Sequence, residues 1–117
     1  MTETFTIYHN PRCSKSRQTL ELLRTHGIEP DVVEYLKTPP SFDTLKTLAT
    51  MLGLEPRQLI RKGEPEYKTL GLDDPTLSDD ALIRAMAEHP VLIERPIVVT
   101  GTRARLGRPP ENVLEIL

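Results

Sequence analysis

The chain begins with an alternation of polar and apolar positions. Residues 4–8 alternate polar side chains with β-branched or aromatic ones, which is typical of a strand with one buried face. Residues 9–11, His-Asn-Pro, interrupt this pattern, and from Ser14 the apolar positions recur at helical spacing until Gly27, a common helix stop. The pattern therefore predicts a strand followed by a helix, with Cys13 at the junction.

A second strand is predicted shortly after that helix. Residues 31–36 are rich in β-branched and large apolar side chains and are followed by Pro39-Pro40. Two strands joined by one helix pair in parallel, because the helix carries the chain back to the starting edge of the sheet. The first part of the chain is therefore predicted to form a βαβ unit.

The middle of the chain shows only helical patterns. Ser41 and Ser78 are typical N-caps, Gly53 is a typical C-terminal stop, and prolines open other short segments. Helices are predicted at residues 42–52, 56–61, 64–70 and 79–88. We interpret residues from about 38 to 90 as an all-helical insertion.

The strand pattern returns near the end of the chain. Residues 96–100 form a predicted strand, Gly101 a turn and residues 103–106 another strand, and Pro109-Pro110 opens a last helix. The fold class is therefore α/β, with a mixed sheet built from βαβ and then ββα. We expect a single domain over residues 1–117 that includes the helical insertion.

Composition narrows the possible functions. A length of 117 residues with 38% hydrophobic and 27% charged residues is typical of one globular domain. The formal net charge of -2 gives no broad basic surface for nucleic acid or an acidic membrane. No membrane span or signal peptide is evident, so we expect the protein in the cytoplasm, where its one cysteine stays a thiol.

Cys13 is the strongest candidate for chemistry. A thiol must ionise to act as a nucleophile, and a helix N-terminus or a nearby cation lowers its pKa. The flanking side chains are cationic or carry hydroxyls that can donate hydrogen bonds: Arg12, Ser14, Lys15, Ser16 and Arg17. We therefore predict a thiolate at neutral pH. The competing interpretation is a buried, inert cysteine, which is the more common environment of a lone cysteine.

An anion site is predicted around the same loop. Backbone N-H groups at a helix start bind tetrahedral oxyanions. Arg61, Arg95 and Arg108 come from distant segments, and each lies beside a glycine or proline in a predicted loop. Guanidinium groups bind oxyanions through paired hydrogen bonds, so three that converge would form an anion site, although each taken singly is typical of solvated surface.

Two further residues have weaker cases. A cis Pro96 would present backbone groups beside the thiol to a second thiol-bearing substrate, but the isomer cannot be derived from sequence. His9 can position water or stabilise the loop, and a lone histidine is more often structural. With one cysteine and three scattered histidines, no metal site is predicted.

Three segments together resemble a known family. Residues 7–17 (IYHNPRCSKSR), 59–62 (LIRK) and 94–99 (ERPIVV) are similar to the glutaredoxin-linked arsenate reductases, and the chain most resembles a short chromosomal branch of that family. Ser14-Lys15 departs from the best-known members, which carry a small residue and a threonine. The resemblance spans nearly the whole chain and implies a thioredoxin-like fold.

The resemblance also implies roles for individual residues. Cys13 would be the nucleophile, the loop would be shaped by His9, Ser16 and Arg17, and the anion would be bound by Arg61, Arg95 and Arg108. The substrate implied is arsenate, with glutathione as co-substrate, glutaredoxin as protein partner and no bound cofactor. Nothing in the sequence requires more than a monomer.

Two alternatives remain open at this stage. One is a glutathione-linked thiol-disulfide or deglutathionylating oxidoreductase with a different substrate. The other is a non-catalytic interaction protein like the Spx regulators, which sense oxidants through a Cys-x-x-Cys pair. Ser16 stands at the second cysteine position here, so this chain lacks that switch.

Overall fold

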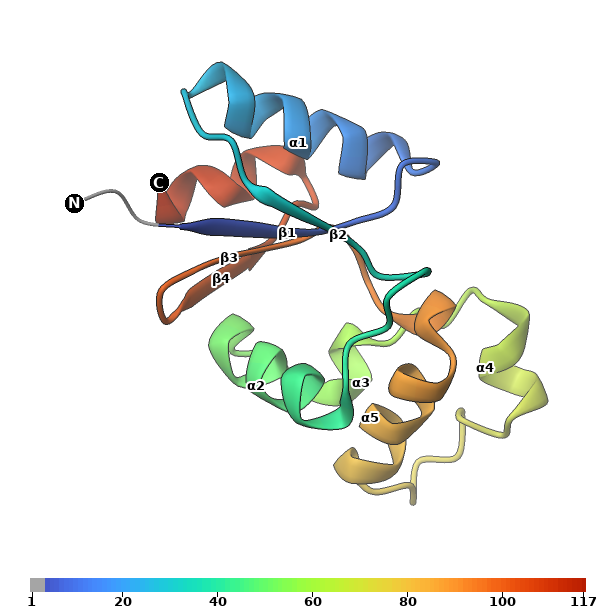
Figure 1. Ribbon diagram of the computed structural model, residues 1–117. Coiled ribbons are helices and arrows are strands. Elements are labelled where there is room, and N and C mark those ends of the chain that lie inside the picture. Colours follow the sequence, from blue (N-terminus) through green and yellow to red (C-terminus); the bar gives the residue numbers. More distant parts are fainter. Residues whose placement is uncertain (1–3) are drawn as a thin grey trace. The chain divides into compact units, whose positions relative to one another are not determined.

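The computed structural model describes residues 4–117 and divides the chain into two compact units (Figure 1). The first unit combines the N-terminal part, up to Thr38, with residues Arg95–Leu117. The second unit comprises Pro39–Glu94. The second unit covers almost the same residues as the predicted helical insertion, so the chain leaves the sheet once and returns to it once.

A mixed four-stranded sheet forms the centre of the first unit, with strand order β2-β1-β3-β4. Its strands are β1 (Phe5–His9), β2 (Asp31–Glu34), β3 (Ile97–Thr100) and β4 (Arg103–Leu106). β1 pairs in parallel with β2 and antiparallel with β3, and β3 pairs antiparallel with β4. The predicted βαβ and ββα pieces and the thioredoxin-like fold class are confirmed.

Two helices cover one face of this sheet, namely α1 (Ser14–Thr25) and the 3-10 helix η2 (Pro110–Ile116) (Figure 1). Their apolar side chains pack with those of the central strands in one fully buried cluster: Phe5, Ile7, Leu23, Val98, Val113 and Ile116. Burial of each large aliphatic side chain stabilises the fold by roughly 1.5–3 kcal/mol. This core fixes α1, and with it the position of Cys13, against β1.

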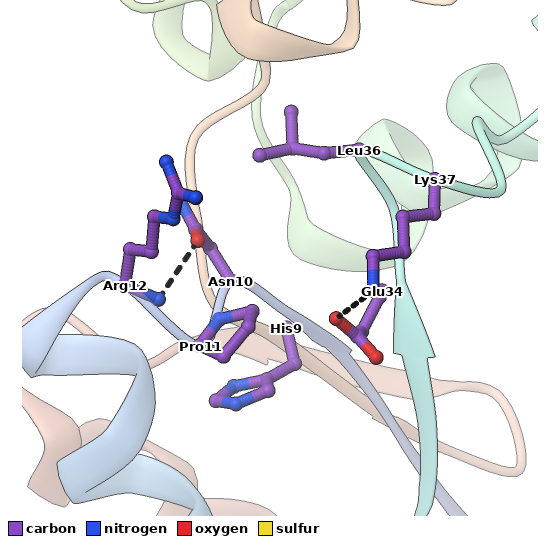
Figure 2. A pocket seen from close by; sticks show the side chains of 7 residues that line it. All are labelled: His9, Asn10, Pro11, Arg12, Glu34, Leu36 and Lys37. Atoms are coloured by element: carbon purple, nitrogen blue, oxygen red, sulfur yellow. Dashed lines mark hydrogen bonds and ion pairs between the residues drawn. The ribbon is translucent and has the colours of Figure 1, made fainter.

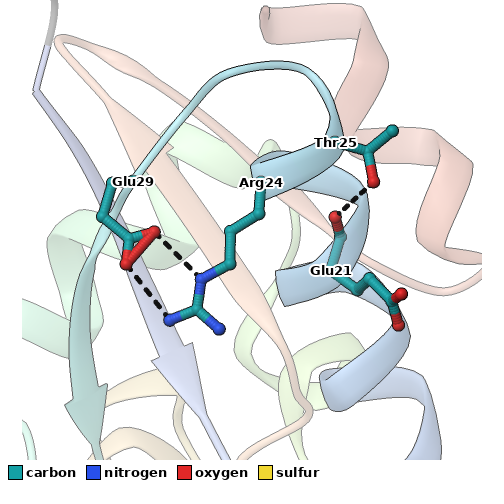
Figure 3. Close-up of polar contacts among 4 residues, drawn as sticks. All are labelled: Glu21, Arg24, Thr25 and Glu29. Carbon is teal, nitrogen blue, oxygen red and sulfur yellow. Dashed lines mark hydrogen bonds and ion pairs between the residues drawn. The ribbon is translucent and has the colours of Figure 1, made fainter.

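The C-terminal end of α1 is held by local contacts. Gly27 adopts a φ of +78°, a conformation that costs glycine little, and its N-H donates to the Arg24 carbonyl. The Arg24 guanidinium also donates to both carboxylate oxygens of Glu29, at 2.9 and 3.2 Å (Figure 3). Both side chains are exposed, so this ion pair contributes little to stability.

The second unit contains α2 (Phe42–Leu52), α3 (Pro56–Leu59), α4 (Pro65–Thr69), α5 (Asp79–Glu88) and the 3-10 helix η1 (Pro90–Leu92). The hydroxyls of Ser41 and Ser78 cap α2 and α5 as predicted, by accepting hydrogen bonds from the N-H groups of Thr44 and Ala81. The sequence analysis did not predict η1. It follows α5 directly and begins at Pro90.

Two elements, β2 and the short helix α3 (Pro56–Leu59), end two residues earlier than predicted because backbone groups have other partners. The strand expected over residues 31–36 ends at Glu34, whose carbonyl accepts from the N-H groups of Lys37 and Thr38 in a turn. The helix expected over residues 56–61 ends at Leu59, because Ile60 leaves it to form an isolated bridge with Ile93. Neither departure alters the order of elements.

Gly107 lies at a close approach between β3, α1 and the loop after β4. Its N-H donates to the Pro96 carbonyl at 2.9 Å. A Cβ atom at Gly107 would collide with Thr19 Oγ1 and would lie 2.8 Å from Pro96 Cγ. Thr19 belongs to α1 and is fully buried. The missing side chain therefore lets the helix behind Cys13 pack directly against the loop that carries Arg108.

We expect Gly107→Ala to lower the free energy of unfolding by about 1–3 kcal/mol, the usual cost of forcing extra volume into a packed site. Urea denaturation measures this change. Gly63→Ala is the matched control, because a Cβ there would meet nothing within 4 Å and neither glycine has a positive φ. Equal effects of the two substitutions would contradict the proposed close packing.

Candidate active site

Cys13 is the N-cap residue of α1, directly after the turn that follows β1. Its N-H donates to the Asn10 carbonyl at 3.0 Å, and its own carbonyl accepts from the Arg17 N-H at 3.0 Å. The thiol is partly exposed. This is the predicted junction of strand and helix, where unpaired backbone N-H groups of the first helical turn point at the sulfur.

The surroundings of the sulfur favour its ionised form. Burial raises the pKa of Cys13, but hydrogen bonds from the backbone N-H groups of Ser16 and Lys15, together with the charge and a hydrogen bond of Arg95, outweigh it. The net result is that the pKa of Cys13 lies below its usual range. The thiol is therefore both accessible and activated.

The cation beside the sulfur comes from a different segment than the sequence suggested. The flanking cations Arg12, Lys15 and Arg17 were expected to lower the pKa, yet the charge that does so belongs to Arg95. The Arg17 guanidinium instead donates to the Pro11 carbonyl at 2.9 Å, which supports a role in shaping the loop. Residues adjacent in sequence at a helix start point in different directions, so proximity along the chain was a poor guide.

A sheet argument would have found Arg95. In the antiparallel pairing of β1 with β3, Tyr8 lies opposite Ile97. The residues just before β3 must therefore lie beside the residues just after β1, which lead into Cys13. Pairing the predicted strands β1 and β3 would therefore have placed Arg95 near Cys13, although the two residues are far apart in the sequence.

The hydroxyl of Ser16 is used within the loop and not at the sulfur. Ser16 Oγ lies 2.6 Å from His9 Nδ1 and accepts a hydrogen bond from the Asn10 N-H at 3.0 Å. Ser16 and His9 are both buried. The expectation that this hydroxyl donates to Cys13 is wrong: Ser16 acts on the thiol through its backbone N-H.

His9 is held in its uncharged form. Burial lowers the pKa of His9, the positive charges of Arg24 and Arg17 lower it further, and the carboxylate of Glu34 opposes them. A neutral imidazole bonded to Ser16 connects the end of β1 to the first turn of α1. This geometry matches the loop-stabilising role considered for His9 in the sequence.

Arg95 and Arg108 lie together in the first unit. Arg108 Nη1 donates to the Arg95 carbonyl at 3.3 Å. Arg95 Nε is buried and has no hydrogen-bond partner among the described residues 4–117. A buried guanidinium nitrogen without an acceptor is costly, unless an anion supplies one.

The peptide bond before Pro96 is cis, as is the bond between Arg108 and Pro109. The cis Pro96 was expected to present backbone groups to a second substrate. Its carbonyl accepts from the Gly107 N-H, and the carbonyl of Arg95 accepts from Arg108. Both carbonyls are thus engaged within the first unit.

Arg61 belongs to the second unit and has carboxylate partners there. Its Nε lies 3.3 Å from Glu64 Oε1, and its Nη1 lies 3.8 Å from Glu94 Oε1. Nη1 is buried without a hydrogen bond among the described residues. The convergence of Arg61 with Arg95 and Arg108 stays a prediction.

Within residues 4–117, no group of three or more His, Cys, Asp or Glu side chains is placed to hold a metal ion. No helix of the described chain is both long and apolar enough to cross a membrane.

Comparisons with known proteins found similar chains. A profile described as the ArsC family matches residues 8–116. A protein of Escherichia coli K12 named uncharacterized protein YfgD is 56% identical over 118 residues, covering 100% of this chain and 99% of that protein. An arsenate reductase of Neisseria meningitidis serogroup A is 52% identical over 112 residues, covering 95% and 96%.

A solved structure, described as arsenate reductase from Vibrio cholerae, superimposes with a TM-score of 0.97. It is 59% identical to this chain and covers 100% of both chains. The likeness thus extends over the sheet, the helical insertion and the cysteine loop.

Arg95→Ala should raise the pKa of Cys13, because the substitution removes a charge and a hydrogen bond while burial, which acts in the opposite direction, remains. The pH dependence of iodoacetamide alkylation measures the pKa, and the rate at pH 7 should fall several-fold. Arg95→Lys keeps the positive charge, so the pKa of Cys13 should stay closer to the wild-type value than in Arg95→Ala. A larger shift in Arg12→Ala than in Arg95→Ala would show that the wrong cation has been assigned.

Ser16→Ala is expected to destabilise the fold by roughly 1–3 kcal/mol, because it leaves the buried His9 nitrogen and Asn10 N-H without their partner. Urea denaturation provides the measurement. Ser14→Ala is the control, since Ser14 is exposed and lies two residues away in the same helical turn. Comparable losses in both variants would argue against the buried bridge.

Proposed function

Because this chain belongs to the ArsC family, whose relatives at 52% identity include proteins named arsenate reductase, we propose that it reduces arsenate to arsenite through the Cys13 thiolate. The observation that carries this proposal is the lowered pKa of Cys13 beside Arg95. A nucleophile and a fixed positive charge at one point suit attack on an oxyanion.

The arginines would hold the substrate. Arg95 and Arg108 are joined by a hydrogen bond, and the buried Arg95 Nε without a partner suits an anionic acceptor. Arg61 would supply a third guanidinium, in exchange for part of its pairing with Glu64 and Glu94. Guanidinium groups keep their charge at every physiological pH, so binding would follow the ionisation of the substrate and the thiol.

The first step would be a substitution at arsenic. The Cys13 thiolate forms a sulfur-arsenic bond, an arsenic-oxygen bond breaks, and that oxygen leaves as water after protonation. Arsenic is not yet reduced at this stage. The helix N-terminus and Arg95 would stabilise both the thiolate before attack and the anionic adduct after it.

The electrons would come from two thiols. Glutathione provides the second sulfur, the Cys13 and glutathione sulfurs join as a mixed disulfide, and the two electrons released reduce arsenate to arsenite. Cys13 is the only cysteine in the chain, so no internal thiol can resolve this disulfide. A glutaredoxin thiolate would attack the glutathione sulfur and release Cys13 as a thiolate.

This requirement for external thiols fits a cytoplasmic setting, where glutathione and glutaredoxin keep thiols reduced. The proposal needs no bound cofactor, because the electrons travel through sulfur. It also needs no second copy of the chain, since the nucleophile and two of the arginines lie within one unit.

One observation favours a second candidate, a glutathione-linked thiol-disulfide oxidoreductase. The charge of Arg61 already faces two carboxylates, which weakens its availability for an oxyanion. An attack on a disulfide needs only the thiolate, and all the groups that lower the pKa of Cys13 lie in the first unit.

A coupled assay separates the two functions. Purified protein, glutathione, glutathione reductase and glutaredoxin are combined with either arsenate or a mixed disulfide, and NADPH oxidation is followed. We expect arsenate-dependent turnover that Cys13→Ser abolishes, because serine cannot form the sulfur-arsenic bond or the disulfide. Rapid turnover of the mixed disulfide with none of arsenate would instead support the oxidoreductase.

The arginine variants serve as internal controls in this assay. Arg61→Ala, Arg95→Ala and Arg108→Ala should each raise the KM for arsenate more than they lower stability, because each removes a predicted oxyanion contact. Parallel losses of activity and stability would identify the affected arginine as structural.

A further inference from the structure

A cavity lies beside the turn that leads into Cys13, and the proposed mechanism has not used it. Its volume is about 220 Å³, and Figure 2 shows that its lining comes from two segments. These are residues 9–12, at the end of β1 and in the turn that follows, and residues 34–37, at the end of β2 and in the turn that follows. The lining residues are His9, Asn10, Pro11, Arg12, Glu34, Leu36 and Lys37. Both segments belong to the first unit.

The composition of the cavity does not suit a free oxyanion. Pro11 and Leu36 contribute apolar surface, and Leu36 is 43% exposed. The predicted anion-binding arginines are not part of this lining. An arsenate ion placed here would lose hydration without gaining the paired hydrogen bonds that those arginines provide.

The charges of the cavity suit a small zwitterion. Arg12 and Lys37 are cationic, Glu34 is anionic, and Lys37 Nζ lies 3.5 Å from Glu34 Oε1. The Lys37 side chain is 78% exposed, so this pair is weak and can exchange partners at little cost. A peptide with free carboxylates and one ammonium group would match two cations and one carboxylate.

The cavity is held close to the reactive sulfur by the turn itself. Asn10 Oδ1 accepts from the Arg12 N-H at 3.0 Å, and the Asn10 carbonyl accepts from the Cys13 N-H at 3.0 Å. Arg12 lines the cavity, and its Cα lies only about 3.8 Å from that of Cys13, the spacing of consecutive residues. A ligand in the cavity therefore lies against the turn that leads into Cys13.

We propose that this cavity is the binding site for the glutathione that reacts at Cys13, an assignment that rests on the use of glutathione in the proposed function. Arg12 and Lys37 bind the carboxylates, Glu34 binds the ammonium group, and Pro11 and Leu36 pack against the methylene groups. The volume is below the roughly 300–1,000 Å³ of pockets that enclose a drug-sized ligand. The cavity therefore holds part of the tripeptide and leaves the rest in solvent.

A reaction without arsenate isolates this binding. Oxidised glutathione reacts with the Cys13 thiolate by exchange: a bond forms between Cys13 and one glutathione sulfur, the original disulfide bond breaks, and the second glutathione leaves as a thiolate. Mass spectrometry of the quenched protein follows the rate as a function of disulfide concentration. Bis(2-hydroxyethyl) disulfide undergoes the same exchange but carries no charge.

Lys37→Glu should raise the half-saturating concentration of oxidised glutathione roughly three- to tenfold, as expected when one attractive charge contact becomes repulsive. The reaction with bis(2-hydroxyethyl) disulfide should stay within about twofold of the wild-type rate, because the thiolate itself is unchanged. Lys37→Arg keeps the charge and should behave like the wild type. Leu36→Asp adds a negative charge to the apolar wall of the cavity. It should also raise the half-saturating concentration of oxidised glutathione.

Lys68→Glu is the matched control, because Lys68 is an exposed lysine of α4 that does not line the cavity. An equal effect of the two charge reversals, or no effect of Lys37→Glu and Leu36→Asp, would overturn the assignment. The assignment would also be overturned if Lys37→Glu slowed the reactions with both disulfides equally, because the substitution would then act on the thiol and not on glutathione binding. Arsenate turnover is measured in a separate assay. Its absence would reject the proposed function, whereas the exchange reactions test glutathione binding in the cavity independently.

Discussion

The stabilisation of negative charge on the Cys13 sulfur, which lowers the pKa of its thiol, is the feature on which the rest of the site depends. Burial opposes that charge, and backbone N-H groups of α1 together with Arg95 overcome the penalty. Each of these donors needs a particular part of the fold: α1 must begin at residue 14, and β3 must bring Arg95 beside the end of β1. The fold therefore lowers the pKa of this thiol by placing donors from two segments around one atom.

Packing behind the cysteine keeps those donors in place. Leu23 anchors α1 in the apolar core, and the buried Ser16 hydroxyl connects the helix to His9 and Asn10. At Gly107 the absence of a side chain allows the following loop to approach Thr19 closely. These contacts are polar or very close, so they fix both the position and the orientation of α1 behind Cys13.

Most of the fold could be predicted from hydrophobic periodicity and caps, since Ser41, Ser78 and the glycine stops act locally. The predictions were wrong where a residue interacts with a partner that is distant in the sequence. Ile60 leaves its helix for Ile93, and the choice of Arg95 over Arg12 depends on strand pairing. The buried partner of the Ser16 hydroxyl was equally invisible, because His9 and Ser16 are seven residues apart across a turn whose path the sequence does not specify.

The groups around Cys13 and the ion pairs of Arg61 lie in different units of the chain. All the groups that activate Cys13 belong to the sheet-containing unit, and so does the cavity proposed for glutathione. Attack on a disulfide has no need of the helical unit. The proposed use of Arg61 as a third guanidinium for an oxyanion would require it to give up part of its pairing with Glu64 and Glu94. Under the proposed function, the choice between an oxyanion and a disulfide would then depend on how strongly Glu64 and Glu94 compete with the anion for Arg61.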